Sequence, residues 1–244
     1  MTQDWSAQSP MPPLALLAGG LATRLRPITE TIPKSLVAVA GEPFIAHQLR
    51  ALREQGVTRV VICVGHLGEQ IVDFIGDGSR FGLSAGYSFD GETPCGTGGA
   101  LRKALPLLGG VFMTMYGDSY LPTDFAPVME HFQREARAGL MTVFRNEGRW
   151  DSSNVVFEDG QILVYDKVRQ TSDMAFIDYG LGVFRAEAFG AFKERQAFDL
   201  AELYRALLSQ GQLAGYEVRQ RFYEIGSHAG LRETEELLRS KAQK

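Results

Sequence analysis

One stretch constrains the fold of this 244-residue chain more than any other, and it reads LAGGLATRLRPITETIPK from Leu17 to Lys34. The apolar run that leads into it, residues 14–17, is long enough for a strand buried in a parallel sheet. The glycines after this run allow a sharp turn and expose N–H groups to an anion. Arg24 and Lys34 add a guanidinium and an ammonium group that a folded-back loop can bring to one polyphosphate. A Gly-Gly pair alone is also typical of an ordinary turn with solvated basic residues.

Apolar runs alternate with helical patterns over the next hundred residues, which predicts a doubly wound, Rossmann-like and mainly parallel sheet of the α/β class. The expected helices cover residues 43–55, 67–75 and 99–108, and the expected strands cover 58–64, 84–89 and 111–115. We expect the strand at 84–89 to lie at an edge of the sheet.

The pattern changes after about residue 120. Short strands at 140–144, 154–158, 161–165 and 181–184 are joined by turns, which favours a small added antiparallel or mixed β layer. Helices are expected at 189–194, 200–210 and 229–241. Because the composition shows no break along the chain, we expect a flexible tail over residues 1–12 and a single domain over residues 13–244.

The composition is that of an ordinary globular protein, with 45% hydrophobic and 22% charged residues. A formal net charge of −4 argues against a nucleic-acid partner, which needs a basic face. Apolar runs fall short of the roughly eighteen residues that span a bilayer, so we expect no membrane association. The first twelve residues have neither the basic nor the apolar region of a secretory signal, and two cysteines do not suggest a disulfide framework. We therefore expect a cytoplasmic location.

The loop resembles the signature of the sugar-1-phosphate nucleotidyltransferases, or nucleoside-diphosphate-sugar pyrophosphorylases, which is approximately LAGGxGTRLxPLTxxxPKxLxPV. The chain departs from it at Ala22, where the family usually has a glycine. The matching positions are Leu17, Ala18, Gly19, Gly20, Thr23, Arg24, Leu25, Pro27, Thr29, Pro33, Lys34, Leu36 and Val39.

The resemblance extends from residue 14 to about residue 238 and implies an enzyme that transfers a nucleoside monophosphate from a nucleoside triphosphate to a sugar 1-phosphate. Pyrophosphate and a nucleoside-diphosphate sugar are the products. The chain is similar to the short, single-domain bacterial members that serve cell-surface polysaccharide pathways. The chain could also form homo-oligomers, which the resemblance does not decide. The resemblance implies catalytic roles for Arg24 and Lys34. It implies nucleotide binding by Leu17, Ala18, Gly19, Gly20, Thr23, Gly96, Thr97 and Gly99.

Two carboxylates are candidates for a magnesium site. Asp118 follows an expected parallel strand, where open α/β sheets gather ligands, and a carboxylate that faces a triphosphate needs a cation between them. A lone Asp after a glycine is more often a turn former or a helix cap. The family places a metal-binding Asp in its GD motif here and a second one in a D-x-G-[ST] string. In this chain Glu224 stands in place of that second Asp. The alternative to a metal-binding role is that Glu224 is a solvated residue at the end of a strand.

The base and the sugar stay undecided. In the uridylyl and thymidylyl members of the family, a glutamine commonly reads the pyrimidine base, and Gly91 stands at that position here. The chain also departs from the family in the sugar region, and such changes alter which sugar hydroxyls the site recognises. The resemblance implies sugar-phosphate contacts by Lys167, Asn154, Asp178, Tyr179 and Gly180.

Two other classes of protein share some of these sequence features. A regulatory module that binds sugar nucleotides without turnover would fit Ala22 and Glu224, although the retained Arg24, Lys34 and Asp118 argue against it. A Rossmann oxidoreductase would need G-x-G-x-x-G and an acidic residue about twenty positions later, whereas this chain has GGLATR.

Overall fold

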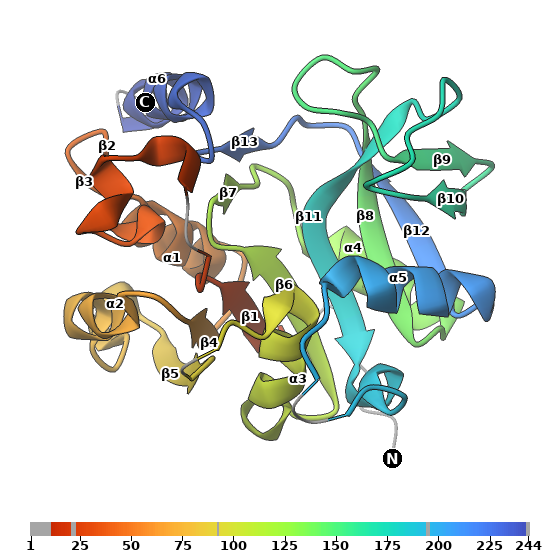
Figure 1. The fold of residues 1–244 in the computed structure, drawn as a ribbon, viewed down its shortest axis with the longest axis horizontal. Coiled ribbons are helices and arrows are strands. Elements are labelled where there is room, and N and C mark those ends of the chain that lie inside the picture. Colours follow the sequence, from red (N-terminus) through yellow and green to blue (C-terminus); the bar gives the residue numbers. More distant parts are fainter. Residues whose placement is uncertain (1–10, 21–22, 92, 194–195, 243–244) are drawn as a thin grey trace.

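The structure is a computed structural model that describes residues 11–20, 23–91, 93–193 and 196–242. Its first half contributes parallel strands to one large sheet (Figure 1). These strands are β1 (Leu14–Leu17), β4 (Arg59–Val64), β5 (Ser84–Phe89) and β6 (Val111–Tyr116). β1 lies between β4 and β6, and β5 forms the edge beyond β4. The predicted strand before the glycine turn is therefore at the centre of the parallel part, where strands are buried on both faces.

The second half extends the same sheet instead of forming a separate one. β11 pairs antiparallel with β6, and β8 and β9 both pair with β11. β12 then lies parallel to β8, and β10 lies antiparallel to β9. The mixed strands expected after residue 120 thus continue a nine-stranded sheet. Their bounds are β8 (Gly139–Arg145), β9 (Val155–Glu158), β10 (Gln161–Tyr165), β11 (Phe176–Arg185) and β12 (Leu213–Val218).

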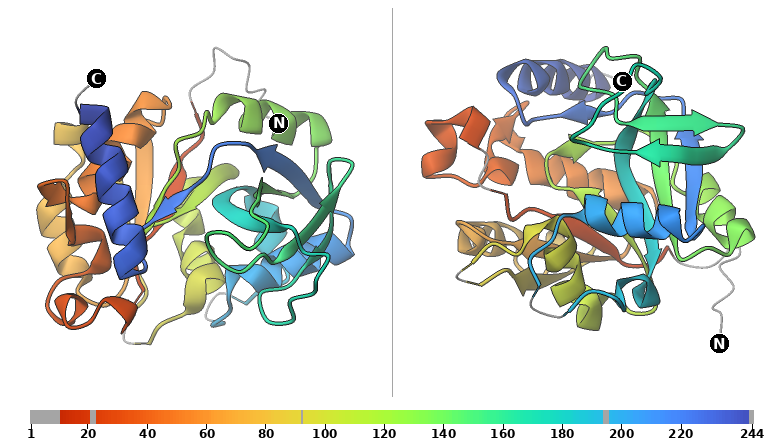
Figure 2. Two further views of the ribbon diagram at one scale, coloured as in Figure 1. Left: turned by 90° about the horizontal axis from the view of Figure 1, so that it is seen from above. Right: turned by 45° about the vertical axis from the view of Figure 1, so that its right-hand side comes forward.

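Helices cover both faces of this sheet (Figure 2). Leu14 and Leu16 of β1 point into the core shared with α1, α2 and α4, whereas Ala15 points into the core shared with α3 and α5. This alternation follows from the period of two along a strand. It makes the sheet doubly wound, as predicted. The helices are α1 (Phe44–Glu54), α2 (Gly68–Ile75), α3 (Gly96–Leu108), α4 (Ala126–Glu135) and α5 (Leu200–Ser209).

Two small antiparallel sheets lie beyond the main sheet. One pairs β2 (Ala38–Val39) with β3 (Glu42–Pro43), and the other pairs β7 (Ser119–Tyr120) with β13 (Tyr223–Glu224). The terminal helix α6 (His228–Ala242) covers them through a small apolar cluster. Figure 1 shows that the C-terminal part of the chain thereby returns to the N-terminal half.

Sequence and structure differ in a few elements. α4 and β12 were not predicted, and residues 186–189 form a 3-10 helix where a helix was expected at 189–194. Residue 194, the last of that expected helix, lies outside the described residues, as do Ala22 and most of the tail expected at residues 1–12. β11 is much longer than the predicted strand at 181–184, because Asp178 and Gly180 interrupt its apolar pattern without ending the strand.

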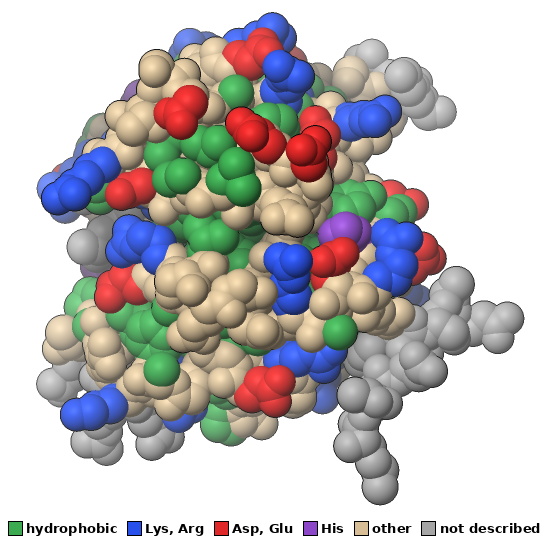
Figure 3. Space-filling view, turned by 90° about the vertical axis from the view of Figure 1, so that its right-hand side faces the viewer, with side chains coloured by type: hydrophobic (Ala, Val, Ile, Leu, Met, Phe, Trp, Pro, Cys, Tyr) green, Lys and Arg blue, Asp and Glu red, His purple; other side chains and the backbone are tan. Residues whose placement is uncertain are grey.

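In the described part of the chain, none of the helices combines the length and the apolar character that crossing a membrane requires. The face of the molecule drawn in Figure 3 carries basic and acidic side chains that are interspersed with apolar ones. The face in this view thus lacks the single-sign field that is typical of a nucleic-acid binding face.

Candidate active site

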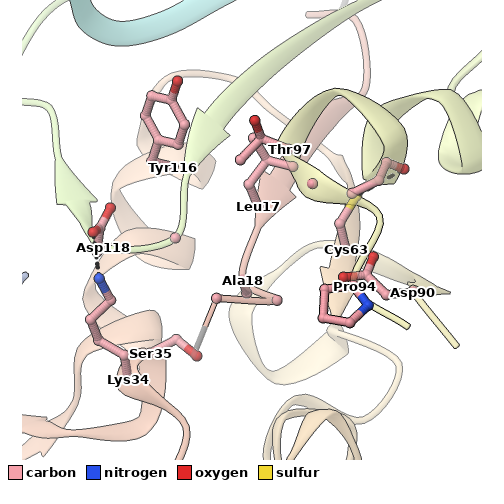
Figure 4. A pocket seen from close by; sticks show the side chains of 15 residues that line it. Leu17, Ala18, Lys34, Ser35, Cys63, Asp90, Pro94, Thr97, Tyr116 and Asp118 are labelled. Carbon is pink, nitrogen blue, oxygen red and sulfur yellow. Dashed lines mark hydrogen bonds and ion pairs between the residues drawn. The ribbon is translucent and has the colours of Figure 1, made fainter. Parts of the chain in front are cut away.

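A pocket of about 410 Å³ opens where β1 and β6 end, at the edge where parallel strands present their carboxyl ends to ligands (Figure 4). Six of the predicted nucleotide-binding residues line it, namely Leu17, Ala18, Gly19, Gly20, Gly96 and Thr97. The glycine turn and the beginning of α3 therefore face one cavity, although about 75 residues separate them along the chain.

Close packing requires the first glycine of the turn. A Cβ atom on Gly19 would lie 3.0 Å from Asp90 Oδ2 and 3.2 Å from the amide nitrogen of Gly65. The adjacent amide of Ala18 donates a hydrogen bond to the carbonyl oxygen of Cys63 at 2.9 Å. Gly20 has open space at the same position and is exposed. The turn is thus hydrogen-bonded to the backbone of β4 through Ala18, and its exposed residue Gly20 has space for a ligand beside it.

Lys34 and Asp118 form the charged end of the pocket. Lys34 begins the 3-10 turn Lys34–Leu36, and its ammonium nitrogen lies 2.6 Å from Asp118 Oδ2. Both side chains are partly buried, at 19% and 27% exposure, so water screens this ion pair less than a surface pair. Next to Lys34, the buried hydroxyl of Ser35 also lines the pocket, and it has no hydrogen-bond partner in the described part of the chain. Unpaired buried polar atoms need an explanation, and a bound ligand supplies one.

The pairing of β7 with β13 brings Glu224 beside Asp118. The amide of Ile225 donates to the carbonyl oxygen of Asp118 at 2.9 Å, and Glu224 is in register with Ser119. The Glu224 carboxylate accepts hydrogen bonds from the amide of Gly226 and, at 2.9 Å, from the hydroxyl of Ser227. A Cβ atom on Gly226 would lie 3.5 Å from Asp118 Oδ2 and would overlap Glu224 Oε2, so both carboxylates border this glycine.

This donor set suits magnesium held jointly with a nucleotide. Among the described residues there is no cluster of three or more His, Cys, Asp or Glu side chains that would cage a metal by protein ligands alone. Magnesium is usually bound through one or two carboxylates together with substrate phosphates and water. Asp118 and Glu224 match that requirement.

Four of the predicted sugar-phosphate residues lie together beside the pocket residue Tyr116. Asn154 Oδ1 accepts a hydrogen bond from the amide of Asp178 at 3.0 Å, and the Asp178 carboxylate accepts one from the amide of Gly180 at 3.0 Å. Lys167 Nζ donates to the Tyr116 hydroxyl at 3.4 Å. Burial raises the pKa of Asp178, against the opposing charge of Lys167.

The fifth residue of that group has a different position. The ring of Tyr179 is 1% exposed and packs against Phe144 and Phe222 in the core. Side chains alternate along β11, so Asp178 and Tyr179 point to opposite faces of the sheet. The Tyr179 side chain therefore belongs to the core and not to the pocket wall.

Other predicted residues are near the pocket without lining it. Arg24 lies in the 3-10 turn Thr23–Leu25 with an exposed side chain, and the side chain of Thr23 is outside the description. The amide of Gly99 donates to the carbonyl oxygen of Phe198 at 3.2 Å, so this amide already has a partner within the protein.

Sequence reasoning missed several residues of the wall, above all Asp90. This residue follows the edge strand β5, and its Oδ1 accepts a hydrogen bond from the thiol of Cys95 at 3.2 Å. Burial raises the pKa of Asp90, and burial together with this carboxylate raises the pKa of Cys95 to about 11. An acidic residue directly after a strand was the signal that could have identified it. The remaining residues of the wall are Ser35, Cys63, Pro94, Ala100, Tyr116 and Gly117.

Comparison with known proteins identifies the family of the chain. The model of the family described as Nucleotidyl transferase matches residues 15–241. The N-acetylmuramate alpha-1-phosphate uridylyltransferase of Neisseria meningitidis serogroup B is 31% identical over 226 residues, covering 91% of this chain and 96% of its own length. The UTP–glucose-1-phosphate uridylyltransferase of Synechocystis is 30% identical over 85% of this chain, which spans 58% of that relative.

Solved structures show the same fold. HddC from Yersinia pseudotuberculosis, complexed with GMP-PN, superposes with a TM-score of 0.78 at 21% identity and covers 93% of this chain and 100% of its own. The named relatives are enzymes, which favours the catalytic interpretation over the regulatory module. The chain therefore belongs to the nucleotidyl transferase family and, within it, to the sugar-1-phosphate nucleotidyltransferases.

Proposed function

We propose that the pocket binds a nucleoside triphosphate across the glycine turn and joins it to a sugar 1-phosphate held beside Tyr116. One observation carries the assignment: Lys34 and Asp118 come from distant parts of the chain and form an ion pair at one end of the pocket. Glu224, from the C-terminal segment, lies behind Asp118 across the pairing of β7 with β13. A cation and two carboxylates beside an anion-binding turn are what the transfer of a nucleotidyl group requires.

In the proposed reaction, an oxygen of the sugar phosphate forms a bond to the α-phosphorus while the bond between the α-phosphorus and the bridging oxygen breaks. Pyrophosphate leaves with that oxygen. The attacking phosphate is already an anion, so the reaction needs no general base, and catalysis depends on positioning and on neutralising charge.

Each charged residue of the site has a role in this proposal. Lys34 would leave Asp118 and bridge the α-phosphate and the sugar phosphate, and Arg24 would swing in from its exposed turn to stabilise the pyrophosphate. Ser35 would donate its unpaired hydroxyl to a phosphate oxygen. Asp118 and Glu224 would hold magnesium, which supplies positive charge to the phosphate oxygens when it is bound.

The sugar phosphate would lie next to Lys167 and Asp178. Lys167 donates to the hydroxyl of the pocket residue Tyr116, and Asp178 is hydrogen-bonded to Asn154 and Gly180, of which Gly180 lies against the Tyr116 ring. The relatives act on different sugars and one solved neighbour carries a guanine nucleotide analogue, so the comparisons leave both the sugar and the base open.

The test is release of pyrophosphate with magnesium, using GTP, UTP, CTP, ATP and dTTP against a panel of hexose, hexosamine, muramate and heptose 1-phosphates. Release that depends on one triphosphate and one sugar phosphate supports the proposal. With the best pair, Arg24→Ala and Asp118→Ala should each lower kcat/KM by roughly 10²–10³, as loss of one charge-stabilising group usually does.

Asp73→Ala is the matched control, because Asp73 is exposed on α2 and lies outside the pocket wall. It should leave kcat/KM unchanged. If Arg24→Ala or Asp118→Ala turned over at the wild-type rate, the role given to that residue would be wrong.

A further inference from the structure

The pocket has two chemically different ends. Figure 4 shows the ion pair of Lys34 and Asp118 on one side and Asp90 with Pro94 on the other, with Leu17 and Ala18 between them. A nucleoside triphosphate is elongated in the same sense, with its charge at one end and a flat base at the other. The triphosphate belongs at the end with the cation and the glycine turn, so the base belongs at the end that contains Asp90.

The walls at the Asp90 end fit a flat aromatic ring. Pro94 supplies apolar surface there, and Cys63 lies on the same side, with its thiol 3.9 Å from the carbonyl oxygen of Ala100. The side chain of Leu17 lines the middle of the pocket. Among these apolar groups, a charged oxygen pair is costly to bury unless something hydrogen-bonds to it. Asp90 therefore marks the point where a ligand with hydrogen-bond donors compensates for burial.

Within the described residues, the protein satisfies only part of the hydrogen-bonding capacity of this carboxylate. The Cys95 thiol donates to Oδ1 at 3.2 Å, and Oδ2 lies over the backbone of Gly19 and Gly65, where a Cβ atom would be 3.0 or 3.1 Å away. The ammonium group of Lys103 donates to the carbonyl oxygen of Asp90 at 3.1 Å. An ionised carboxylate has about four acceptor positions and no donor, so Asp90 keeps acceptor capacity for a ligand.

The bases differ in what they can offer to a group that only accepts. Guanine presents two adjacent donors, the ring N1–H and the exocyclic amino group, which match the two oxygens of a carboxylate. Uracil and thymine present one N–H between two carbonyl oxygens, which a carboxylate repels. Cytosine and adenine present an amino group next to a ring nitrogen lone pair, so only one hydrogen bond forms.

We propose that Asp90 reads the base and that this chain selects guanine nucleotides. The inference rests on the proposed function for the position of the triphosphate, and it names the nucleotide that the reaction uses. Cys95 acts as a positioning residue, because its hydrogen bond fixes the orientation of the carboxylate. Its thiol stays protonated, and so remains a donor, at neutral pH.

The experiment measures the equilibrium binding of GTP, UTP, CTP, ATP and dTTP to the wild-type chain by calorimetry, in the presence of magnesium and in the absence of sugar phosphate. GTP should bind roughly 10- to 100-fold more tightly than the others, which is the discrimination usual for one bidentate contact to a base. Tighter binding of UTP or dTTP than of GTP would overturn the inference.

Asp90→Asn tests the residue itself. An amide offers one acceptor and one donor, which match the N–H and a carbonyl oxygen of uracil but not the two donors of guanine. We expect GTP affinity to fall roughly 10- to 100-fold while UTP affinity rises, a change of preference that a merely structural role would not produce. Asp73→Asn is the control and should bind all five nucleotides like the wild type. Unchanged preference in Asp90→Asn would refute the assignment.

The outcomes separate this inference from the proposed function. Selective GTP binding that depends on Asp90, without pyrophosphate release from any sugar phosphate, would support the inference and contradict the proposed reaction. Pyrophosphate release with UTP but not with GTP would support the reaction and refute the inference. Retained UTP binding in Asp90→Asn would show that this variant is folded.

Discussion

Asp90 is a half-buried carboxylate whose charge lowers the stability of the fold but is needed for the base contact that we propose. Burial raises its pKa, and this effect outweighs the hydrogen bond from Cys95 and the charge of Lys103, which both lower it. The group is therefore harder to ionise in the folded chain than in the unfolded chain. Buried acidic groups of this kind usually persist because a ligand uses the charge.

This shift predicts how stability depends on pH. Between the ordinary Asp pKa near 3.8 and the raised value, the folded chain binds more protons than the unfolded chain, so the contribution of Asp90 to the free energy of unfolding falls as pH rises. Asp90→Asn lacks this titration. We expect urea denaturation to show that the variant gains stability relative to the wild type between pH 4 and pH 7.5. A relative stability that is constant over this range would contradict the shift.

The amino end of α3 shows how one element positions the pocket wall. The carbonyl oxygen of Phe198 accepts hydrogen bonds from the amides of Gly98 and Gly99 at 3.0 and 3.2 Å. The ring of Phe198 packs so closely on the helix that a Cβ atom on Gly98 would overlap it. The glycines at the start of α3 therefore let the chain around Phe198, which precedes α5, pack closely against this helix. Gly96, in the same stretch, lines the pocket.

Gly98→Ala tests this packing. Alanine in a helix normally adds up to about 1 kcal/mol of stability over glycine, whereas forcing a side chain into a filled core costs about 1–3 kcal/mol. Because the overlap is with an aromatic ring held by backbone hydrogen bonds, we expect the clash to prevail and the free energy of unfolding to fall. Gly110→Ala has open space around its Cβ position and should leave stability nearly unchanged. Equal stability of the two variants would contradict the packing argument.

At the scale of the whole molecule, one sheet connects the two halves of the chain. β6 joins the parallel strands to β11, and β13 returns the C-terminal segment to β7. Asp118 follows β6 and precedes β7, whereas Glu224 lies in β13, so the proposed metal ligands meet only when both halves are folded. Assembly of the site thus depends on the complete sheet.

This continuity predicts one cooperative unfolding transition, in keeping with a single domain over residues 13–244. In a Trp5→Phe background, the fluorescence of Trp150, whose ring stacks on Arg221, reports on the loop between β8 and β9, and far-ultraviolet circular dichroism reports on all elements. The two signals should give the same midpoint in urea within error. Midpoints that differ clearly would indicate two units that unfold separately, and would contradict the single domain.

Much of the fold could be predicted because local patterns determine it. The strand over 84–89 and the strand over 161–165 have the predicted bounds, and the helix expected at 43–55 is present as α1. β12 was not predicted because its sequence, LAGYEV, lacks a strong apolar alternation. This segment forms a strand through its pairing with β8. Two-residue strands such as β7 and β13 carry too little local signal to be predicted.

The sequence by itself determined the family, most of the longer strands and helices, and the residue types that a phosphate-binding loop needs, because motif and periodicity are properties of neighbours along the chain. Only the tertiary structure decided that Asp90 faces the pocket, that Tyr179 lies in the core and that Glu224 borders Asp118. Those positions follow from strand pairing and from which face each side chain occupies, and both are set by contacts between residues distant in sequence.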